Sequence, residues 1–518
     1  MSTNSHLPDE KNGNIQKDLS GKVKSGYLWT VLSNGIGQPL SFVFGIVLAR
    51  ILSPADFGIV ASCLIFTEIG STLVGSSFAS GLIQKKELLK QDISTGFILQ
   101  FITSVVVALL VIGLSPLASL AMKEQLVTPV LSLLSLNFII LNFCVIPTVI
   151  ARRNLNFRLI TKAEVAEIIA NGVIASGLAI GGFGVWSLVL GRLSGRIVYS
   201  FVLILATKWR PTIHFDKSSA SYLWKICVKF AVKEILDDTA RNIDYFLVGW
   251  RLGMTPLGFY SRAYNLMTLP ITNLSKSLSK VLFPAFSLIQ SEESRIVRGM
   301  LKSNCAIAIA TFPLLMGLML VAPTFIPFVY GAKWMPTVQP LQILCFAGLF
   351  YSIDTTAISV INAKAYLIPE IRRQLVHMVL LVLGVLIGSK WGLIGVSWGV
   401  TITAVIYWFL LLQLLKMRIR LSLKEYLESL LPASISCIVM IFMVLFFQKI
   451  IVPLYFMDSQ LLNLAGSVFV GVLSYLLVLF FADRLIESAI IEGTYLELRK
   501  FLESIRFSLL GVFKKSLE

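Results

Sequence analysis

Hydrophobic stretches of roughly 20 residues recur along almost the whole chain and are separated by short polar loops. A helix of that length crosses a hydrocarbon core of about 30 Å, so each stretch is a candidate transmembrane helix. We count about fourteen stretches, the first beginning near residue 25 and the last ending near residue 482. The pattern predicts an all-α polytopic membrane protein.

The loops between the stretches alternate between rich and poor in Lys and Arg. One set of loops, together with both chain ends, holds about 31 of these residues. The intervening loops hold only about six, which are Arg50, Lys123, Arg251, Lys333, Lys390 and Lys449. Because loops rich in Lys and Arg stay in the cytoplasm, we expect an even number of spans and two cytoplasmic termini.

Composition supports the membrane class and excludes several others. Hydrophobic residues make up 56% of the chain and charged residues 14%, whereas a soluble domain carries about 25% charged residues. The net charge of +17 is explained by cytoplasmic loops facing anionic lipid, so we expect membrane lipid and no nucleic acid as a partner. The six cysteines are spread singly and show no metal-ligand spacing, and residues 1–24 lack the apolar region of a signal peptide.

Two sets of six spans, 25–206 and 225–415, look related. The segment Arg50–Gly58 after the first span aligns with Arg251–Phe259 after the seventh when one gap is allowed. Gly181–Ser187 matches Gly392–Trp398 in the same way, between spans five and six and between eleven and twelve. The repeat predicts two pseudo-symmetric six-helix lobes with a site at their interface; the alternative is that both matches are ordinary helix-turn chemistry.

The remaining segments complete the predicted organisation. Residues 1–24 are expected to form a disordered cytoplasmic tail, and residues 207–224 a basic cytoplasmic linker between the lobes. Two further transmembrane helices over 429–482 have no counterpart in the repeat. Residues 485–518 show apolar positions at helical spacing among basic ones, which predicts an amphipathic cytoplasmic helix, either at the membrane interface or docked on the loops.

Span seven differs most from its surroundings because it carries seven charges within 16 residues: Lys229, Lys233, Glu234, Asp237, Asp238, Arg241 and Asp244. At about 2.5–3.5 kcal/mol each, exposing them to lipid would cost on the order of 18–25 kcal/mol, while the apolar neighbours return only about 3–5 kcal/mol. This segment must therefore face water or other polar groups. Two overlapping interpretations remain, a cavity lining and a ladder of intrahelical ion pairs at four-residue spacing.

Other intramembrane polar residues extend this picture. Span eight carries Arg262 near Tyr260 and Tyr264, and span six carries Arg192. Uncompensated cations in a cavity suit an anion, and aromatic groups suit sugar rings. Glu68 and Asp354 are isolated carboxylates that either couple a proton or sodium ion or pair with a cavity arginine, and pairing is the favoured fate.

Gly35, Gly37 and Pro39 in span one predict a bend suited to alternating access. No GxxxxGK[ST] loop occurs, and the three histidines form no metal or nucleophile constellation. We therefore expect no cofactor, no metal, no ATP hydrolysis and no catalytic residue.

The run Phe44–Gly58 resembles the opening of the polysaccharide transporter, or Wzx-type flippase, family of the multidrug/oligosaccharidyl-lipid/polysaccharide (MOP) superfamily. Ser80–Gln84, Asp244–Gly249 and Gly258–Tyr264 are similar to the same family. The resemblance covers roughly residues 20–415 and is strongest to the branch of colanic-acid and teichuronic-acid exporters.

This resemblance implies a V-shaped pair of MATE- or MurJ-like lobes in a bacterial plasma (inner) membrane. Such proteins flip undecaprenyl-pyrophosphate-linked oligosaccharide for exopolysaccharide, O-antigen, capsule or lipopolysaccharide synthesis, driven by a proton or sodium gradient and beside polymerase and export machinery. The pyrophosphate or an acidic repeat unit would be held by a cationic group: Arg262, Arg241, Lys229, Lys233 and Arg192. Asp237, Asp238 and Asp244 would orient those cations or couple the ion.

Two alternative functions are weighed against a flippase. An integral membrane glycosyltransferase or polymerase of lipid-linked glycans needs catalytic groups on a long outer loop, and the longest outer loops here have about a dozen residues. A cation-coupled drug antiporter of the same superfamily would favour an acidic and aromatic cavity over Arg and Lys. The sequence does not reveal which glycan is carried.

Overall fold

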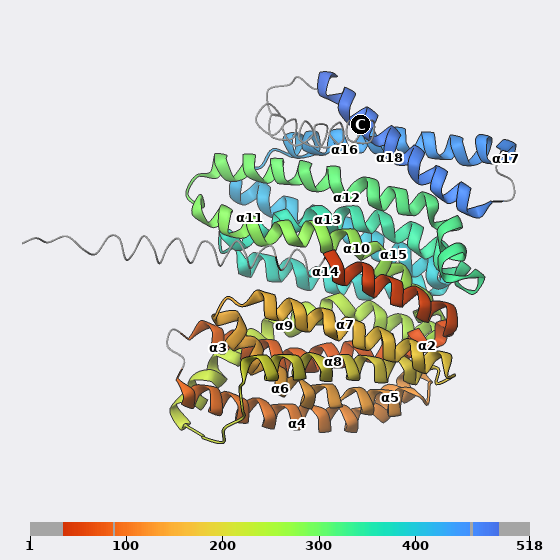
Figure 1. Cartoon of the computed structure of the whole chain (residues 1–518). Coiled ribbons are helices and arrows are strands. Elements are labelled where there is room, and N and C mark those ends of the chain that lie inside the picture. Colours follow the sequence, from red (N-terminus) through yellow and green to blue (C-terminus); the bar gives the residue numbers. More distant parts are fainter. Residues whose placement is uncertain (1–28, 30–34, 86–88, 456–458, 486–518) are drawn as a thin grey trace, which may run out of the picture. The chain divides into compact units, whose positions relative to one another are not determined.

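The computed structural model describes residues 29, 35–85, 89–455 and 459–485 (Figure 1). Within these residues the chain is built of helices and contains no strand. The predicted tail 1–24, and all but the first residue of the predicted tail 485–518, lie outside the described residues.

Ten helical runs in the described chain are long and apolar enough to cross a membrane, and one of them, 368–419, holds two helices. The other predicted spans are helical too: the shorter apolar helix Gly35–Ile51, the charged helix α9 and the α10–α11 pair. The prediction of an all-α polytopic membrane protein is confirmed.

By its internal contacts the chain divides into two compact units. The first unit comprises Met1–Ser261 and Val329–Trp334, and the second comprises Arg262–Phe328 and Met335–Glu518. This division falls inside α10 instead of at the linker 207–224, because α9 packs against α2, α3 and α4. The two six-helix lobes drawn from the sequence repeat are a separate description, and their boundaries remain a prediction.

After the helix Gly35–Ile51, the first unit contains α2 to α9 and the start of α10: α2 (Pro54–Ser71), α3 (Ser77–Gln84), α4 (Lys90–Met122), α5 (Val127–Leu134), α6 (Leu136–Arg153), α7 (Phe157–Ile180), α8 (Val185–Thr207), α9 (Lys217–Leu252) and α10 (Met254–Pro270). A π-helical turn, Thr72–Ser76, joins α2 to α3. The side chain of Ser53 accepts from the amide of Asp56, whose carboxylate accepts from the amide of Ser53, and Pro54 opens α2. This capping box fixes the start of the helix.

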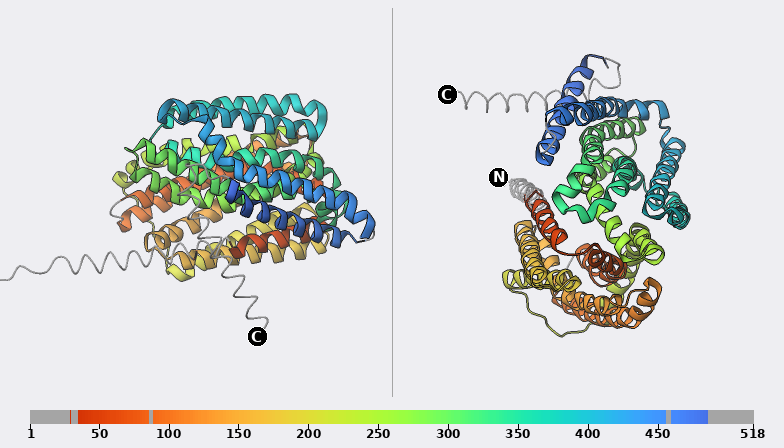
Figure 2. Two further views of the ribbon diagram at one scale, coloured as in Figure 1. Left: turned by 90° about the horizontal axis from the view of Figure 1, so that it is seen from above. Right: turned by 90° about the vertical axis from the view of Figure 1, so that its right-hand side faces the viewer.

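The second unit contains the rest of α10 and α11 to α18: α11 (Lys276–Leu288), α12 (Glu293–Tyr330), α13 (Val338–Ala363), α14 (Leu367–Gly388), α15 (Gly392–Ile419), α16 (Leu423–Phe446), α17 (Val452–Tyr455) and α18 (Gln460–Leu485). Further π-helical turns, Ile271–Ser275 and Phe447–Ile451, follow α10 and α16. Helices α16 and α18 pack on one another (Figure 2).

Two helical hairpins share a close-packing device that reflects the sequence repeat. In the α7–α8 hairpin, a Cβ on Gly191 would lie 2.6 Å from the Cβ of Ala175. In the α14–α15 hairpin, a Cβ on Gly388 would lie 2.3 Å from the carbonyl oxygen of Gly395. Only glycine permits such backbone approach, so both matched turns lead into hairpins that small residues hold together.

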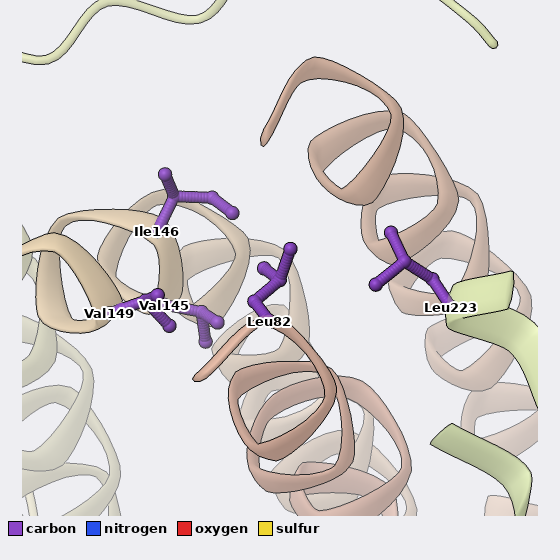
Figure 3. Packing of buried hydrophobic residues seen from close by; sticks show 5 residues of the cluster. All are labelled: Leu82, Val145, Ile146, Val149 and Leu223. Carbon is purple, nitrogen blue, oxygen red and sulfur yellow. The ribbon is translucent and has the colours of Figure 1, made fainter. Parts of the chain in front are cut away.

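One end of the first unit is fastened by an apolar cluster and an ionic network. The cluster consists of Leu82, Val145, Ile146, Val149 and Leu223, from α3, α6 and α9 (Figure 3). Beside it, fully buried Asp92 accepts hydrogen bonds from Lys85 Nζ at 2.5 Å and Ser219 Oγ at 2.6 Å. Trp209 from the linker packs against the cluster. The linker is thereby fixed to the first unit.

The start of α9 is set by a second carboxylate. Asp216 accepts a 2.7 Å hydrogen bond from the backbone amide of Ser219 and caps the helix. The hydrogen bond from that backbone amide holds the pKa of Asp216 below its usual value. The cap therefore stays ionised, and its negative charge suits the amino end of the helix.

Candidate functional site

A polar face runs through the apolar helices of the first unit, and its centre is an ion pair between α2 and α8. Arg192 Nη2 lies 2.9 Å from Glu68 Oε1. The Glu68 side chain is 43% exposed and the Arg192 side chain 35%, although both sit well inside predicted spans. Charged groups at such depth are stable where they face a polar or water-filled space. The pair therefore marks a polar surface within the membrane region.

A second contact links α2 to the charged helix α9. Thr72 Oγ1 donates to Asp238 Oδ2 at 2.5 Å, and the Asn242 side chain donates to the backbone oxygen of Asp238 at 2.9 Å. Thr72 opens the π-helical turn Thr72–Ser76, and such turns are frequent at functional sites because they redirect side chains. Asp238 thus has a partner on another helix.

Deeper in the same unit, Asp244 is almost completely buried. Its Oδ2 accepts from the Tyr260 hydroxyl at 2.6 Å, and its Oδ1 accepts from the Tyr245 amide at 2.9 Å. Tyr260 is itself fully buried and makes an edge contact with the ring of Tyr245. In this structure the Tyr260 hydroxyl is hydrogen-bonded to Asp244. The position of Tyr260 therefore gives no support to its predicted contact with substrate.

The other residues predicted on span seven are placed only in part. Arg241 is exposed on α9, whereas the side chains of Lys229, Lys233 and Asp237 lie outside the described residues. The intrahelical ladder is therefore not tested. The side chains of two aspartates of α9, Asp238 and Asp244, are described. Each accepts a hydrogen bond from a side chain outside α9.

The remaining predicted substrate residues are half-buried on α10. Arg262 and Tyr264 both have interaction partners, and Arg262 belongs to the second unit. The predicted hinge residues Gly35, Gly37 and Pro39 lie in the helix Gly35–Ile51. A Cβ on Gly37 would meet Ile168 at 2.9 Å, while Gly35 faces open space. Their role in bending remains a prediction.

Asp354 on α13 contrasts with these carboxylates. It is buried, and neither of its oxygens has a hydrogen-bond partner within the described chain. The fully buried Asn304 on α12 likewise has an amide nitrogen without a partner among the described residues. The hydroxyl of Tyr426 on α16 accepts from Trp408 at 3.1 Å and lies within electrostatic range of Asp354. Buried polar side chains of α12, α13 and α16 therefore gather inside the second unit.

Two contacts were not foreseen from the sequence. Arg196 on α8 lies 3.5 Å from Glu167 on α7, next to the Glu68–Arg192 pair. Trp334, in the 3-10 helix Ala332–Thr337, is 1% exposed and donates its indole hydrogen to the carbonyl oxygen of Ala49 at 2.9 Å. Arg196 stands four residues after Arg192, which could have suggested a shared role; nothing local in the sequence indicates the position of Trp334.

Among the described residues, no group of three His, Cys, Asp or Glu side chains could hold a metal ion. All six cysteines are free thiols, five of them buried and Cys305 half-buried. The chemistry that the polar face offers is recognition by hydrogen bonds and charge.

Known proteins place the chain in a family. A family model described as polysaccharide biosynthesis protein matches residues 47–339, more than half of the chain. The chain belongs to this polysaccharide biosynthesis family. It is 27% identical over 395 residues to the lipopolysaccharide biosynthesis protein WzxC of Escherichia coli (strain K12), covering 75% of this chain and 80% of that protein.

A second relative extends over more of the chain, and a solved structure shows the fold. The teichuronic acid biosynthesis protein TuaB of Bacillus subtilis (strain 168) is 25% identical over 470 residues, covering 89% of this chain and 96% of TuaB. The lipid II flippase MurJ, in an inward closed conformation, matches with a TM-score of 0.72 at 17% identity, over 88% of this chain and 99% of MurJ. The MurJ-like fold expected from the sequence, two six-helix lobes with two additional helices, is confirmed. The chain is a multi-pass inner-membrane protein.

Proposed function

We propose that this protein translocates undecaprenyl-pyrophosphate-linked oligosaccharide across the bacterial plasma membrane by alternating access, for the synthesis of a surface polysaccharide. The observation that carries the proposal is the half-exposed Glu68–Arg192 pair inside apolar helices of a polysaccharide biosynthesis protein. A structural ion pair needs no contact with water, whereas a binding surface inside the membrane must stay accessible. The protein moves its substrate and makes no bond in it.

Recognition of the lipid-linked glycan divides into three parts. Guanidinium groups suit the pyrophosphate because they form paired, charge-assisted hydrogen bonds with its oxygens, and Arg192 and Arg241, both in the first unit, are the arginines we assign to it. Arg262, in the second unit, stays a prediction from the sequence. Hydroxyl and carboxylate groups at Thr72 and Asp238 suit the hydroxyls of the sugars. The prenyl chain needs no polar site and stays in lipid. Lys229 and Lys233 complete the predicted cationic set.

The membrane orientation and the energy source belong to the same proposal. The Lys and Arg distribution supports cytoplasmic termini, so the substrate would enter from the Lys/Arg-rich side. Transport against a gradient requires coupling, and we assign this role to Asp354, whose buried carboxylate needs a proton or a sodium ion to offset its charge. Glu68, Asp237, Asp238 and Asp244 would instead orient the cations. A polymerase or export complex would receive the product.

Purified protein reconstituted into liposomes with lipid-linked oligosaccharide in one leaflet tests the proposal. We expect the glycan to appear in the other leaflet at a rate that depends on the protein and is raised by a proton or sodium gradient, with its sugar number unchanged. New glycosidic bonds without leaflet exchange would establish the glycosyltransferase alternative. Export of cationic drugs without glycan movement would establish the antiporter alternative.

A further inference from the structure

The short segment Val329–Trp334, called here the strap, packs with the first unit although the chain on both sides of it belongs to the second. It links the end of α12 to the start of α13 and contains Lys333 and Trp334. Any movement of these two helices is therefore transmitted to the strap through a few peptide bonds.

The strap is attached through the carboxyl end of the helix Gly35–Ile51. Lys333 Nζ donates to the carbonyl oxygens of Arg50 at 2.8 Å and Leu52 at 2.7 Å, and the Trp334 indole donates to that of Ala49 at 2.9 Å. In return, Arg50 Nε donates to the carbonyl oxygen of Val329 at 2.8 Å. The last carbonyls of a helix lack partners within it, so the strap supplies a cap from about 280 residues away.

Trp334 is the largest fully buried side chain among the described residues, and it is held between two helix starts. Its ring makes edge contacts with Phe57 of α2, at 5.4 Å between centroids, and with Phe259 of α10, at 5.9 Å. Phe57 directly precedes Gly58, and Phe259 directly follows Gly258. The tryptophan therefore covers the place where α2 and α10 meet.

At that place the backbones of α2 and α10 touch in a reciprocal way. A Cβ on Gly58 would lie 1.8 Å from the carbonyl oxygen of Met254, and a Cβ on Gly258 would lie 1.9 Å from that of Pro54. The two contacts are related by an offset of 200 residues, close to the offset of 201 between Arg50 and Arg251 in the sequence repeat. Neither position can accept even a methyl group unless the helices move apart.

We propose that the strap and the Gly58–Gly258 crossing form a releasable seal at the Lys/Arg-poor end of the polar face, an inference that rests on the proposed function. Gly58 precedes Glu68 by ten residues on α2, about 15 Å along the helix axis. Closed, the seal keeps water on that side of the membrane from the Glu68–Arg192 pair. Released, it opens a path for the polar head of the substrate.

The chemistry of the attachment suits release. Of the four hydrogen bonds described above, the one from Trp334 is buried, whereas the other three join the exposed side chains of Lys333 and Arg50 to backbone carbonyls. Water can replace such bonds at helix ends with little loss, whereas the buried Asp92 network at the opposite end of α2–α3 would leave a charge without a partner. The structure therefore pairs a fixed end with an end that can open.

The test is the access of a membrane-impermeant thiol reagent to a cysteine reporter at Ser71, which lies between Glu68 and Thr72. The reporter is compared in four backgrounds of the full chain. Gly58→Ala forces the crossing apart, and its control, Gly113→Ala on α4, faces open space. Lys333→Met removes two hydrogen bonds from the strap, and its control, Lys390→Met, changes an exposed lysine in another loop of the same side. The chain without the reporter gives the background of the native thiols.

In right-side-out vesicles we expect Gly58→Ala and Lys333→Met each to raise the labelling rate of Ser71→Cys several-fold, while both controls leave it unchanged. Unchanged labelling in folded Lys333→Met would overturn the seal, even if Gly58→Ala fails to fold. The proposed function is judged separately by leaflet exchange in the wild-type liposomes. Increased labelling without wild-type exchange would support a seal in a protein with a different substrate.

Discussion

Intramembrane carboxylates have hydrogen-bond partners in the first unit, whereas the one in the second unit has none among the described residues. In the first unit, Glu68 pairs with Arg192, Asp238 accepts from Thr72, and Asp244 accepts from Tyr260. In the second unit, Asp354 is buried and no described group donates to it. Both units consist of apolar helices, so the contrast lies in what surrounds each acid.

The contrast separates two ways of keeping a carboxylate inside a membrane protein. A paired acid that stays half-exposed, such as Glu68, belongs to a surface that water and ligands reach. A dry acid without a partner costs several kcal/mol as an ion and calls for a proton or a cation. We therefore assign substrate recognition to the first unit and ion coupling to the second, and the following experiments test that division.

The largest effect is expected from Arg192→Ala. A charge-assisted hydrogen bond contributes about 1.5–3 kcal/mol, and each 1.4 kcal/mol corresponds to a factor of ten, so glycan translocation should fall about tenfold or more. Folding should survive because both members of the pair are half-exposed. The rate of leaflet exchange in proteoliposomes measures the effect, with Arg372→Ala, an exposed arginine of α14, as control. A wild-type rate in Arg192→Ala would remove the anion-binding role.

Tyr260→Phe should cause the largest loss of stability. It deprives the buried Asp244 of its 2.6 Å hydrogen bond while conserving the ring, which should lower the free energy of unfolding by about 1–3 kcal/mol. Unfolding by SDS in mixed micelles measures it, and Tyr222→Phe, at an exposed tyrosine, is the control. Equal stability of the two variants would mean that the contact is energetically unimportant.

A smaller loss is expected from Thr72→Val, which removes the donor to Asp238 with little change in volume. Because Asp238 is only half-buried, water can replace the lost hydroxyl, and we expect a decrease of about 0.5–1.5 kcal/mol in the same unfolding assay. The matched change Thr255→Val alters an exposed threonine at the start of α10. A loss as large as that of Tyr260→Phe would show that this contact is drier than the exposure of Asp238 indicates.

The smallest change in stability is expected from Asp354→Asn. No described hydrogen bond is lost, and a neutral amide of the same shape replaces the acid, so the free energy of unfolding should change by less than about 1 kcal/mol. Translocation driven by a proton or sodium gradient should nevertheless lose its dependence on that gradient. Strong destabilisation, or gradient dependence like that of the wild type, would place coupling elsewhere.

The sequence predicted the architecture well because local signals determine it. Apolar stretches of roughly 20 residues define the spans. The cost of exposing the charges of α9 to lipid was enough to predict that this helix has polar surroundings. The π-helical turn at Thr72 could not be predicted, because its placement depends on packing between helices.

The contacts that could not be predicted join residues that are distant in the sequence. Glu68 and Asp354 looked alike as isolated carboxylates, yet Glu68 meets an arginine 124 residues away and Asp354 meets none among the described residues. The burial of Trp334 was not predicted, because it depends on a contact with Ala49, 285 residues earlier. Gly58 and Gly258 lie in the segments that indicate a repeat, but the repeat does not predict that the two segments touch.

The most direct test of the division compares the reaction of a water-soluble thiol reagent with cysteines at the two kinds of acid. Glu68→Cys and Asp354→Cys are each labelled in the full chain, with the native cysteines as background. We predict fast labelling at position 68, slowed by bound lipid-linked oligosaccharide, and none above background at position 354. Labelling at position 354 as fast as at position 68, or no labelling at position 68, would contradict it.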